Sequence, residues 1–198
     1  VHKVWNDNVA ILSGDAMLVL AYQFMAQCAS EKLKDVMDLF SLTALEICEG
    51  QQLDMEFEQR KDVKEDEYIE MIRLKTSVLL AASLKIGAIL GGASKEDADA
   101  LYDFGVNLGL AFQLKDDLLD VYGDPLRFGK NIGGDILCNK KTYLVIKAFE
   151  HANTDQEALL NDWFTREAFD PQEKIAAVTR LYNEIGVKAL CENRIVEY

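Results

Sequence analysis

Apolar residues recur at spacings of three and four positions along almost the whole chain. Such spacings place side chains on one face of an α-helix, whereas a half-buried strand alternates at a spacing of two. The chain has no Asn-Gly or Asp-Gly pair to indicate a β-hairpin, and Pro125 and Pro171 are its only prolines. The pattern predicts an all-α protein with long helices.

Local signals mark the expected helix ends. Charged residues from Lys61 to Glu67 break the apolar spacing and indicate a surface turn. Gly91 and Gly92 are typical of a helix end, and Ser94 followed by Asp97 resembles the capping box that begins a helix. The predicted helices run over about 6–29, 31–60 and 66–90, from 94 into the aspartates near 116, and over about 140–151, 155–168 and 171–198. In the first helix the expected inner stripe consists of Ile11, Leu18, Tyr22 and Met25.

Gly50, Gly105 and Gly109 lie inside predicted helices, where glycine is costly and needs a reason. For Gly50 the favoured interpretation is the close approach of another helix, and the alternative is ligand access to Gln51 and Asp54. Gly105 and Gly109 lie four residues apart on one side of their helix. This spacing indicates tight helix packing there.

A polar pair, Lys75-Thr76, interrupts the otherwise apolar helix predicted over 66–90. The lysine either extends along apolar surface to solvent, which is the commoner case, or points its charge into a cavity that holds an anion. The local pattern leaves both interpretations open.

Composition narrows the class of protein. The 198 residues are 49% hydrophobic, which predicts one globular domain over residues 1–198. A formal net charge of −13, with basic residues scattered among acids, argues against a nucleic-acid surface. Four cysteines without Cys-x-x-Cys spacing suit a reducing compartment, so we expect a cytoplasmic protein. No run of eighteen apolar residues occurs, so neither a membrane span nor stable membrane insertion is predicted.

Three aspartates end the helix that begins near residue 94. Asp116 and Asp120 stand four residues apart and project from one face, with Asp117 beside them. Two carboxylates on one face form half of a site for Mg²⁺, which takes its other ligands from water and phosphate oxygens. Zinc does not fit, since His2 and His151 stand alone. The alternative is a solvated acidic patch in an acidic chain.

A glycine-rich stretch follows the aspartates and carries Lys130, with Lys140 and Lys141 after it. Glycines let the backbone approach a ligand closely, and lysines supply mobile positive charges. Carboxylates, glycines and lysines together predict a phosphate group bridged by Mg²⁺.

These residues and their order resemble the trans-isoprenyl diphosphate synthases of the polyprenyl synthetase family. The resemblance covers nearly the whole chain. It implies an isoprenoid synthase-type bundle of long antiparallel helices around a central apolar cavity. The ordered motifs are Gly14-Asp15, Gly50-Gln51 with Asp54, Lys75-Thr76, Gly109-Leu110-Ala111-Phe112-Gln113, Asp116-Asp117-x-x-Asp120, Gly129-Lys130, Asp135 and Lys140.

The resemblance also implies roles for individual residues. Asp116 looks like the principal carboxylate of the family's second aspartate-rich motif, with Asp117 and Asp120 supporting the same Mg²⁺. The residues implied to contact the allylic diphosphate are Lys75, Lys130 and Lys140, with Lys141 left open as an alternative to Lys140. Thr76 and Gln113 look like polar groups near the developing allylic cation, and Gln51 and Asp54 are expected at the same cavity.

The implied activity is head-to-tail condensation of an allylic diphosphate with isopentenyl diphosphate by a Mg²⁺-dependent prenyltransferase. A non-catalytic subunit of a heteromeric prenyl synthase and a class I terpene cyclase are the alternatives. The resemblance also suggests a homodimer. In the family that the chain resembles, product length depends on residues just upstream of the first aspartate-rich motif, which this sequence does not contain.

One departure from the family pattern concerns its first Asp-Asp-x-x-Asp motif and the following Arg-Arg pair, which this sequence lacks. The chain opens on Val1, so we expect it to be the carboxyl-terminal part of a longer protein whose N-terminal helices are missing here. The isopentenyl diphosphate site would also lie upstream. We therefore expect the 198-residue chain alone to have little or no synthase activity.

Overall fold

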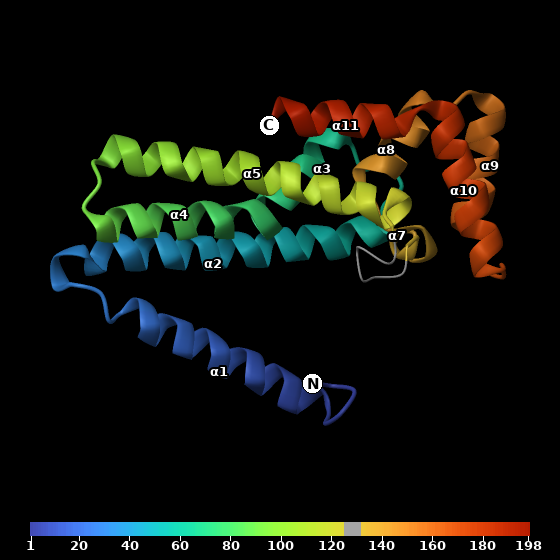
Figure 1. The fold of residues 1–198 in the computed structure, drawn as a ribbon. Coiled ribbons are helices and arrows are strands. Elements are labelled where there is room, and N and C mark those ends of the chain that lie inside the picture. Colours follow the sequence, from blue (N-terminus) through green and yellow to red (C-terminus); the bar gives the residue numbers. More distant parts are fainter. Residues whose placement is uncertain (125–131) are drawn as a thin grey trace.

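A computed structural model describes residues 1–124 and 132–198, and the described residues form helices without any strand (Figure 1). The all-α prediction is confirmed. The elements are α1 (Asp7–Met25), α2 (Ser30–Gln59), α3 (Glu65–Ile72), the π-helix η1 (Arg73–Ser77), α4 (Val78–Gly91), α5 (Lys95–Tyr122), α7 (Gly134–Leu137), α8 (Tyr143–His151), α9 (Thr154–Thr165), α10 (Pro171–Ile185) and α11 (Val187–Glu197).

Three long helices, α2, α4 and α5, lie side by side, with α4 running opposite to the other two (Figure 1). Gly105 allows α5 to approach α4 closely, because a Cβ there would lie 2.5 Å from the Ala81 Cα. The shorter helices α8 to α11 gather around the C-terminal half of α5 and enclose the main apolar core with α3. The bundle therefore has a packed end and an open end.

Two predicted helices are interrupted in the structure. The helix expected over 66–90 contains the π-turn η1, and the last helix breaks at Gly186, whose φ is 85°. The expected surface turn is shorter than predicted, because α3 already begins at Glu65. The Ser94 cap is confirmed, since its hydroxyl accepts a hydrogen bond from the Asp97 N–H.

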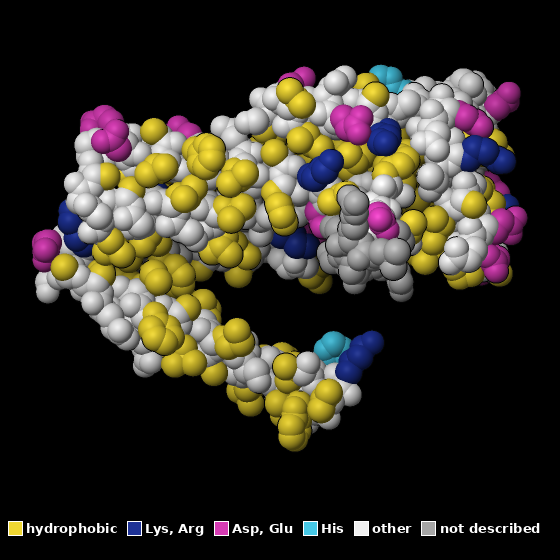
Figure 2. Space-filling view, viewed as in Figure 1, with side chains coloured by type: hydrophobic (Ala, Val, Ile, Leu, Met, Phe, Trp, Pro, Cys, Tyr) yellow, Lys and Arg dark blue, Asp and Glu magenta, His cyan; other side chains and the backbone are white. Residues whose placement is uncertain are grey.

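Helix α1 has only the C-terminal part of the inner stripe that its spacing predicts, where Tyr22 and Met25 are half-buried. None of its residues is buried, and Ile11 and Leu18 are 62% and 49% exposed. Only its C-terminal part has a ring contact, where Tyr22 packs edge-on against Phe40 of α2 with ring centroids 4.8 Å apart. The prediction was wrong for Ile11 and Leu18, because α1 packs mainly on α2 near their connection and then diverges from the bundle, exposing apolar side chains (Figure 2).

Within residues 1–124 and 132–198, two helical stretches are long and apolar enough to cross a membrane, α1 and the continuous run Glu65–Gly91. The absence of a run of eighteen apolar residues had predicted no such span. Core helices of globular proteins meet the same criterion, and 28% of the second stretch is buried inside this protein.

Candidate active site

The predicted site residues come from α2, η1 and α5, and from the segment that follows α7. A glycine on α2, Gly50, lets α2 and η1 pack closely together. A Cβ on Gly50 would lie 2.4 Å from the Lys75 backbone nitrogen, so only glycine lets α2 touch η1 here. One turn further along α2, Asp54 accepts a hydrogen bond from Lys75 Nζ at 2.6 Å. The close-packing interpretation of Gly50 is confirmed, and the same contact places Lys75 beside Asp54.

The third element, α5, packs against the π-turn in the same way. A Cβ on Gly109 would lie 2.5 Å from the Ser77 Cα. This close approach lets the Thr76 hydroxyl donate to Gln113 Oε1 at 3.2 Å. A π-turn adds a residue to the helical turn and redirects the side chains around it. It therefore contributes to aiming Lys75 and Thr76 toward α2 and α5.

Asp117 lies behind these residues, in the protein interior. It is 2% exposed; Gln113 Nε2 donates to its Oδ1 at 3.2 Å, and the Tyr68 hydroxyl donates to its Oδ2. Burial raises the pKa of the Asp117 carboxyl to about 7, while the hydrogen bond from Tyr68 and the charge of Lys140 act in the opposite direction. Both carboxylate oxygens of Asp117 therefore accept hydrogen bonds from protein side chains, and the bond from Tyr68 links α5 to α3. The supporting role of Asp117 toward Mg²⁺ stays a prediction.

A second set of carboxylates gathers where α5 meets α7. The Asp135 N–H donates to Asp120 Oδ2 at 3.0 Å, and Lys140 Nζ lies 3.6 Å from Asp135 Oδ1. Burial raises the pKa of Asp135; the charges of Asp120 and Asp116 raise it further, while that of Lys140 lowers it. The four side chains therefore share one electrostatic environment.

Lys140 connects this carboxylate group to the rest of the site. Burial alone would lower its pKa, but the carboxylates of Asp135, Asp117 and Asp54 raise it above the ordinary value. Lys140 is thus held as a cation among acids. Lys141 lies in different surroundings: its Nζ donates to the Asn139 carbonyl at 3.1 Å, and burial and the charge of Lys61 lower its pKa. The geometry favours Lys140 as the lysine of the carboxylate group.

Three predicted residues remain outside this cluster. Lys130 and Gly129 lie outside the described residues. Gln51 is exposed on α2, and no hydrogen bond joins its side chain to the described residues of the site. Tyr68 was not among the predicted site residues, and Asp135 was predicted as a motif residue without a role. Tyr68 could have been suspected, because a tyrosine on an apolar helix face needs a polar partner for its hydroxyl.

The donor atoms near α5 can be tested for their fit to Mg²⁺. Within the described residues, no group of three or more His, Cys, Asp or Glu side chains is arranged to hold a metal ion. Asp116 and Asp120 are four residues apart on α5, so they offer oxygen donors from one face. This donor set fits a cation that takes most of its ligands from phosphate oxygens and water, as Mg²⁺ does.

Comparison with known proteins agrees with this arrangement of motifs. The polyprenyl synthetase family model matches residues 1–184. The chain belongs to this family. It is 42% identical over 200 residues to a geranylgeranyl diphosphate synthase of Methanosarcina mazei, covering 100% of this chain and 60% of the relative.

Solved structures of family members have the same fold. A geranylgeranyl pyrophosphate synthase superposes with a TM-score of 0.94 at 44% identity, covering 100% of this chain and 62% of the other. A geranylgeranyl pyrophosphate synthase of Corynebacterium glutamicum, complexed with isoprenyl diphosphate and magnesium, gives a TM-score of 0.86 at 32% identity, covering 96% and 54%. The isoprenoid synthase-type helical fold is thereby confirmed, and the chain spans less than two thirds of each of these relatives.

Proposed function

We propose that the protein containing this chain is a Mg²⁺-dependent prenyltransferase that condenses an allylic diphosphate with isopentenyl diphosphate to make a longer trans-prenyl diphosphate. The observation that carries the proposal is the joining of Lys75, Asp54, Lys140 and the α5 aspartates into one electrostatic cluster. This cluster offers both anion-binding and cation-binding groups, as a metal-bridged diphosphate requires.

In this proposal Asp116 and Asp120 hold Mg²⁺, which supplies charge neutralisation of the diphosphate leaving group. The lysines act on the same group from the protein side. Lys75 and Lys140 each have a carboxylate partner, so they are ordered before the diphosphate arrives, and they can donate hydrogen bonds to its oxygens. Lys130 is proposed as a third diphosphate contact from its sequence motif alone.

Thr76 and Gln113 provide the polar groups proposed near the allylic carbons. Their mutual hydrogen bond at 3.2 Å fixes the Gln113 amide, whose Nε2 already donates to Asp117. A fixed oxygen dipole can stabilise positive charge that develops on a neighbouring carbon without reacting with it. No described residue is needed as a covalent nucleophile for this reaction.

The choice of Mg²⁺ is supported by the C. glutamicum relative, whose structure contains magnesium together with isoprenyl diphosphate. A non-catalytic subunit would not need both carboxylate and lysine groups in contact. A cytoplasmic location stays a prediction.

We also propose that the protein is a homodimer. Apolar side chains lie exposed on α1 and along α5, including Phe104 and Phe112. A second copy with the same apolar surfaces would bury them. Light scattering with Phe104→Ser as a variant tests this, and a monomeric wild-type protein would refute it.

The decisive experiment assays the longest protein that its gene encodes, with Mg²⁺, labelled isopentenyl diphosphate and dimethylallyl, geranyl or farnesyl diphosphate. We expect elongated products, and we expect Asp116→Ala to lower turnover by about 100-fold or more. Asp103→Ala is the matched control, because Asp103 is an exposed carboxylate elsewhere on α5, and it should leave turnover unchanged. Absence of elongation by folded, Mg²⁺-loaded protein would refute the function.

A further inference from the structure

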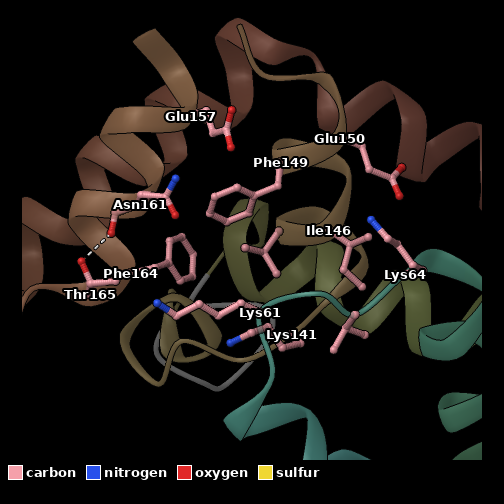
Figure 3. Close-up of a pocket in the computed structure, with 12 residues that line it drawn as sticks. Lys61, Lys64, Lys141, Ile146, Phe149, Glu150, Glu157, Asn161, Phe164 and Thr165 are labelled. Atoms are coloured by element: carbon pink, nitrogen blue, oxygen red, sulfur yellow. Dashed lines mark hydrogen bonds between the residues drawn. The ribbon is translucent and has the colours of Figure 1, made fainter. Parts of the chain in front are cut away.

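A pocket separate from the carboxylate cluster lies between the α2–α3 connection and helices α8 and α9 (Figure 3). Its volume is about 340 Å³, near the lower end of the range of small-molecule sites. Its lining includes Lys141 but neither Lys140 nor any of the α5 aspartates. The pocket therefore forms no part of the proposed active site.

Three lysines contribute to the lining, which is unusual in a chain with a formal net charge of −13. Lys61 and Lys64 belong to the α2–α3 connection, and Lys141 follows Lys140. Among the described residues, neither the Lys61 nor the Lys64 ammonium has an ion pair or a hydrogen bond to an acceptor. Burial and the charge of Lys61 lower the pKa of Lys141, and the carboxylate of Glu58 offsets only part of this, so the two ammonium groups repel each other. An anion between them would remove this repulsion.

The remaining wall of the pocket is largely apolar. Phe149 of α8 and Phe164 of α9 meet edge-to-face with ring centroids 6.0 Å apart. Val145 and Ile146 also line the pocket and are almost fully buried. Figure 3 shows Lys61 and Lys141 on one side of these rings. The pocket thus places an apolar wall next to a pair of positive charges.

Two carboxylates also line the pocket, but neither pairs with the lysines. Glu150 forms an ion pair with Lys147, at 2.7 Å, and Figure 3 shows it beside Lys64. Glu157 lies across the rings from Lys61 and Lys141 in the same view. The side that carries Lys61 and Lys141 has no carboxylate in the pocket lining, although Glu58 acts on Lys141 from outside that lining.

We propose that this pocket binds an amphipathic organic anion, in which one phosphate or carboxylate group lies between Lys61 and Lys141 and a compact aryl or alkyl body packs against Phe149 and Phe164. The size of the cavity limits that body to about one ring or a short chain. The proposal does not depend on prenyl transfer, so it can fail or succeed independently of the proposed function.

The test uses the longest protein that the gene encodes, with phenyl phosphate as the probe, and measures binding by titration calorimetry and by amide chemical shifts. We expect saturable binding, with shifts confined to α8, α9 and residues 60–65. A double variant that carries both Lys61→Gln and Lys141→Gln should bind phenyl phosphate about tenfold more weakly or worse. Inorganic phosphate and phenol, which each lack one half of the ligand, should bind at least about tenfold more weakly than phenyl phosphate.

Two controls keep the experiment specific. Lys95→Gln removes a lysine whose side chain is 86% exposed on α5 and should leave binding unchanged. Lys140→Gln should also leave it unchanged, which separates this pocket from the carboxylate cluster. The proposal is overturned if phenyl phosphate shows no saturable binding, or if the affinity of the Lys61→Gln, Lys141→Gln protein equals that of the wild type. It is equally overturned if Lys140→Gln abolishes binding.

Discussion

Lys140 and Lys141 are neighbours in sequence, but they belong to two regions of opposite charge. On one side, Asp135, Asp117 and Asp54 raise the pKa of Lys140 and keep it cationic. On the other side, burial and Lys61 lower the pKa of Lys141. The difference teaches that the charge environment of a lysine depends on the tertiary neighbours of its ammonium group rather than on its neighbours in sequence.

Asn139 turns the chain between the two regions. Its φ of 53° is left-handed, which asparagine adopts more readily than most residues. Its side chain accepts a hydrogen bond from Lys174 Nζ at 2.6 Å and donates to the Phe164 carbonyl at 3.3 Å. Lys174 is fully buried, and its ammonium lies 4.3 Å from the centroid of the Phe169 ring. These contacts hold the turn from which the two lysines diverge.

The two regions are also built differently. The carboxylate region depends on close helix packing, in which Gly50 and Gly109 lie directly against the backbone of η1. The lysine pocket is formed by helix ends and a connection, and the side chains there leave a cavity. Substitutions should therefore affect the regions separately.

The largest expected contrast comes from removing each lysine in turn. If the longest encoded protein is a prenyltransferase, Lys140→Ala should lower its turnover by about 100-fold or more, since it removes a preordered cation from the carboxylate cluster. Lys141→Ala should change turnover by less than about threefold, because its ammonium lies in the other region. Steady-state rates with an allylic diphosphate measure both. Equal losses in the two variants would remove the distinction between the regions.

A smaller contrast is expected for stability. Gly109→Ala brings a Cβ within 2.5 Å of the Ser77 Cα and should lower the free energy of unfolding by about 1–3 kcal/mol. Gly87→Ala is the matched control inside α4, where a Cβ would meet no atom within 4 Å, and it should raise stability by up to about 1 kcal/mol. Urea unfolding compares the two. If Gly109→Ala left the free energy of unfolding unchanged, the close approach of α5 to η1 would not be required for stability.

The smallest expected effect concerns pH. The folded pKa of Asp117 is raised from 3.8 to about 7, so the folded protein binds its proton more tightly than the unfolded chain does. The stability that comes from this proton is complete below the unfolded pKa and is lost as pH rises toward 7. Between pH 5 and 6, wild-type unfolding free energy should fall by about 1 kcal/mol relative to Asp117→Asn.

Urea titrations in buffer containing a chelator measure this difference. Parallel pH profiles for the wild type and Asp117→Asn would contradict a raised pKa for Asp117. Lys141→Gln serves as a comparison from the other region, and it should leave the contribution of Asp117 in place.

The fold class and most helices were predictable from the sequence, because apolar spacing and caps act within a few residues. Ser94 and Gly92 mark their helix ends as expected. The π-turn at Lys75 was not predictable, since the apolar spacing continues across it and its position accompanies the contacts with Gly50 and Gly109. The exposure of Ile11 was also missed, because spacing shows which residues share a face but not what covers it.

The sequence by itself determined the helical elements, the common face of Asp116 and Asp120, and the family to which the motifs belong. Only the tertiary structure decided that Asp117 is buried against Tyr68, that Lys75 meets Asp54, and that Lys140 and Lys141 diverge. The physical reason is that periodicity and capping arise from local backbone geometry, whereas burial, ion pairing and pKa depend on residues brought together from distant parts of the chain.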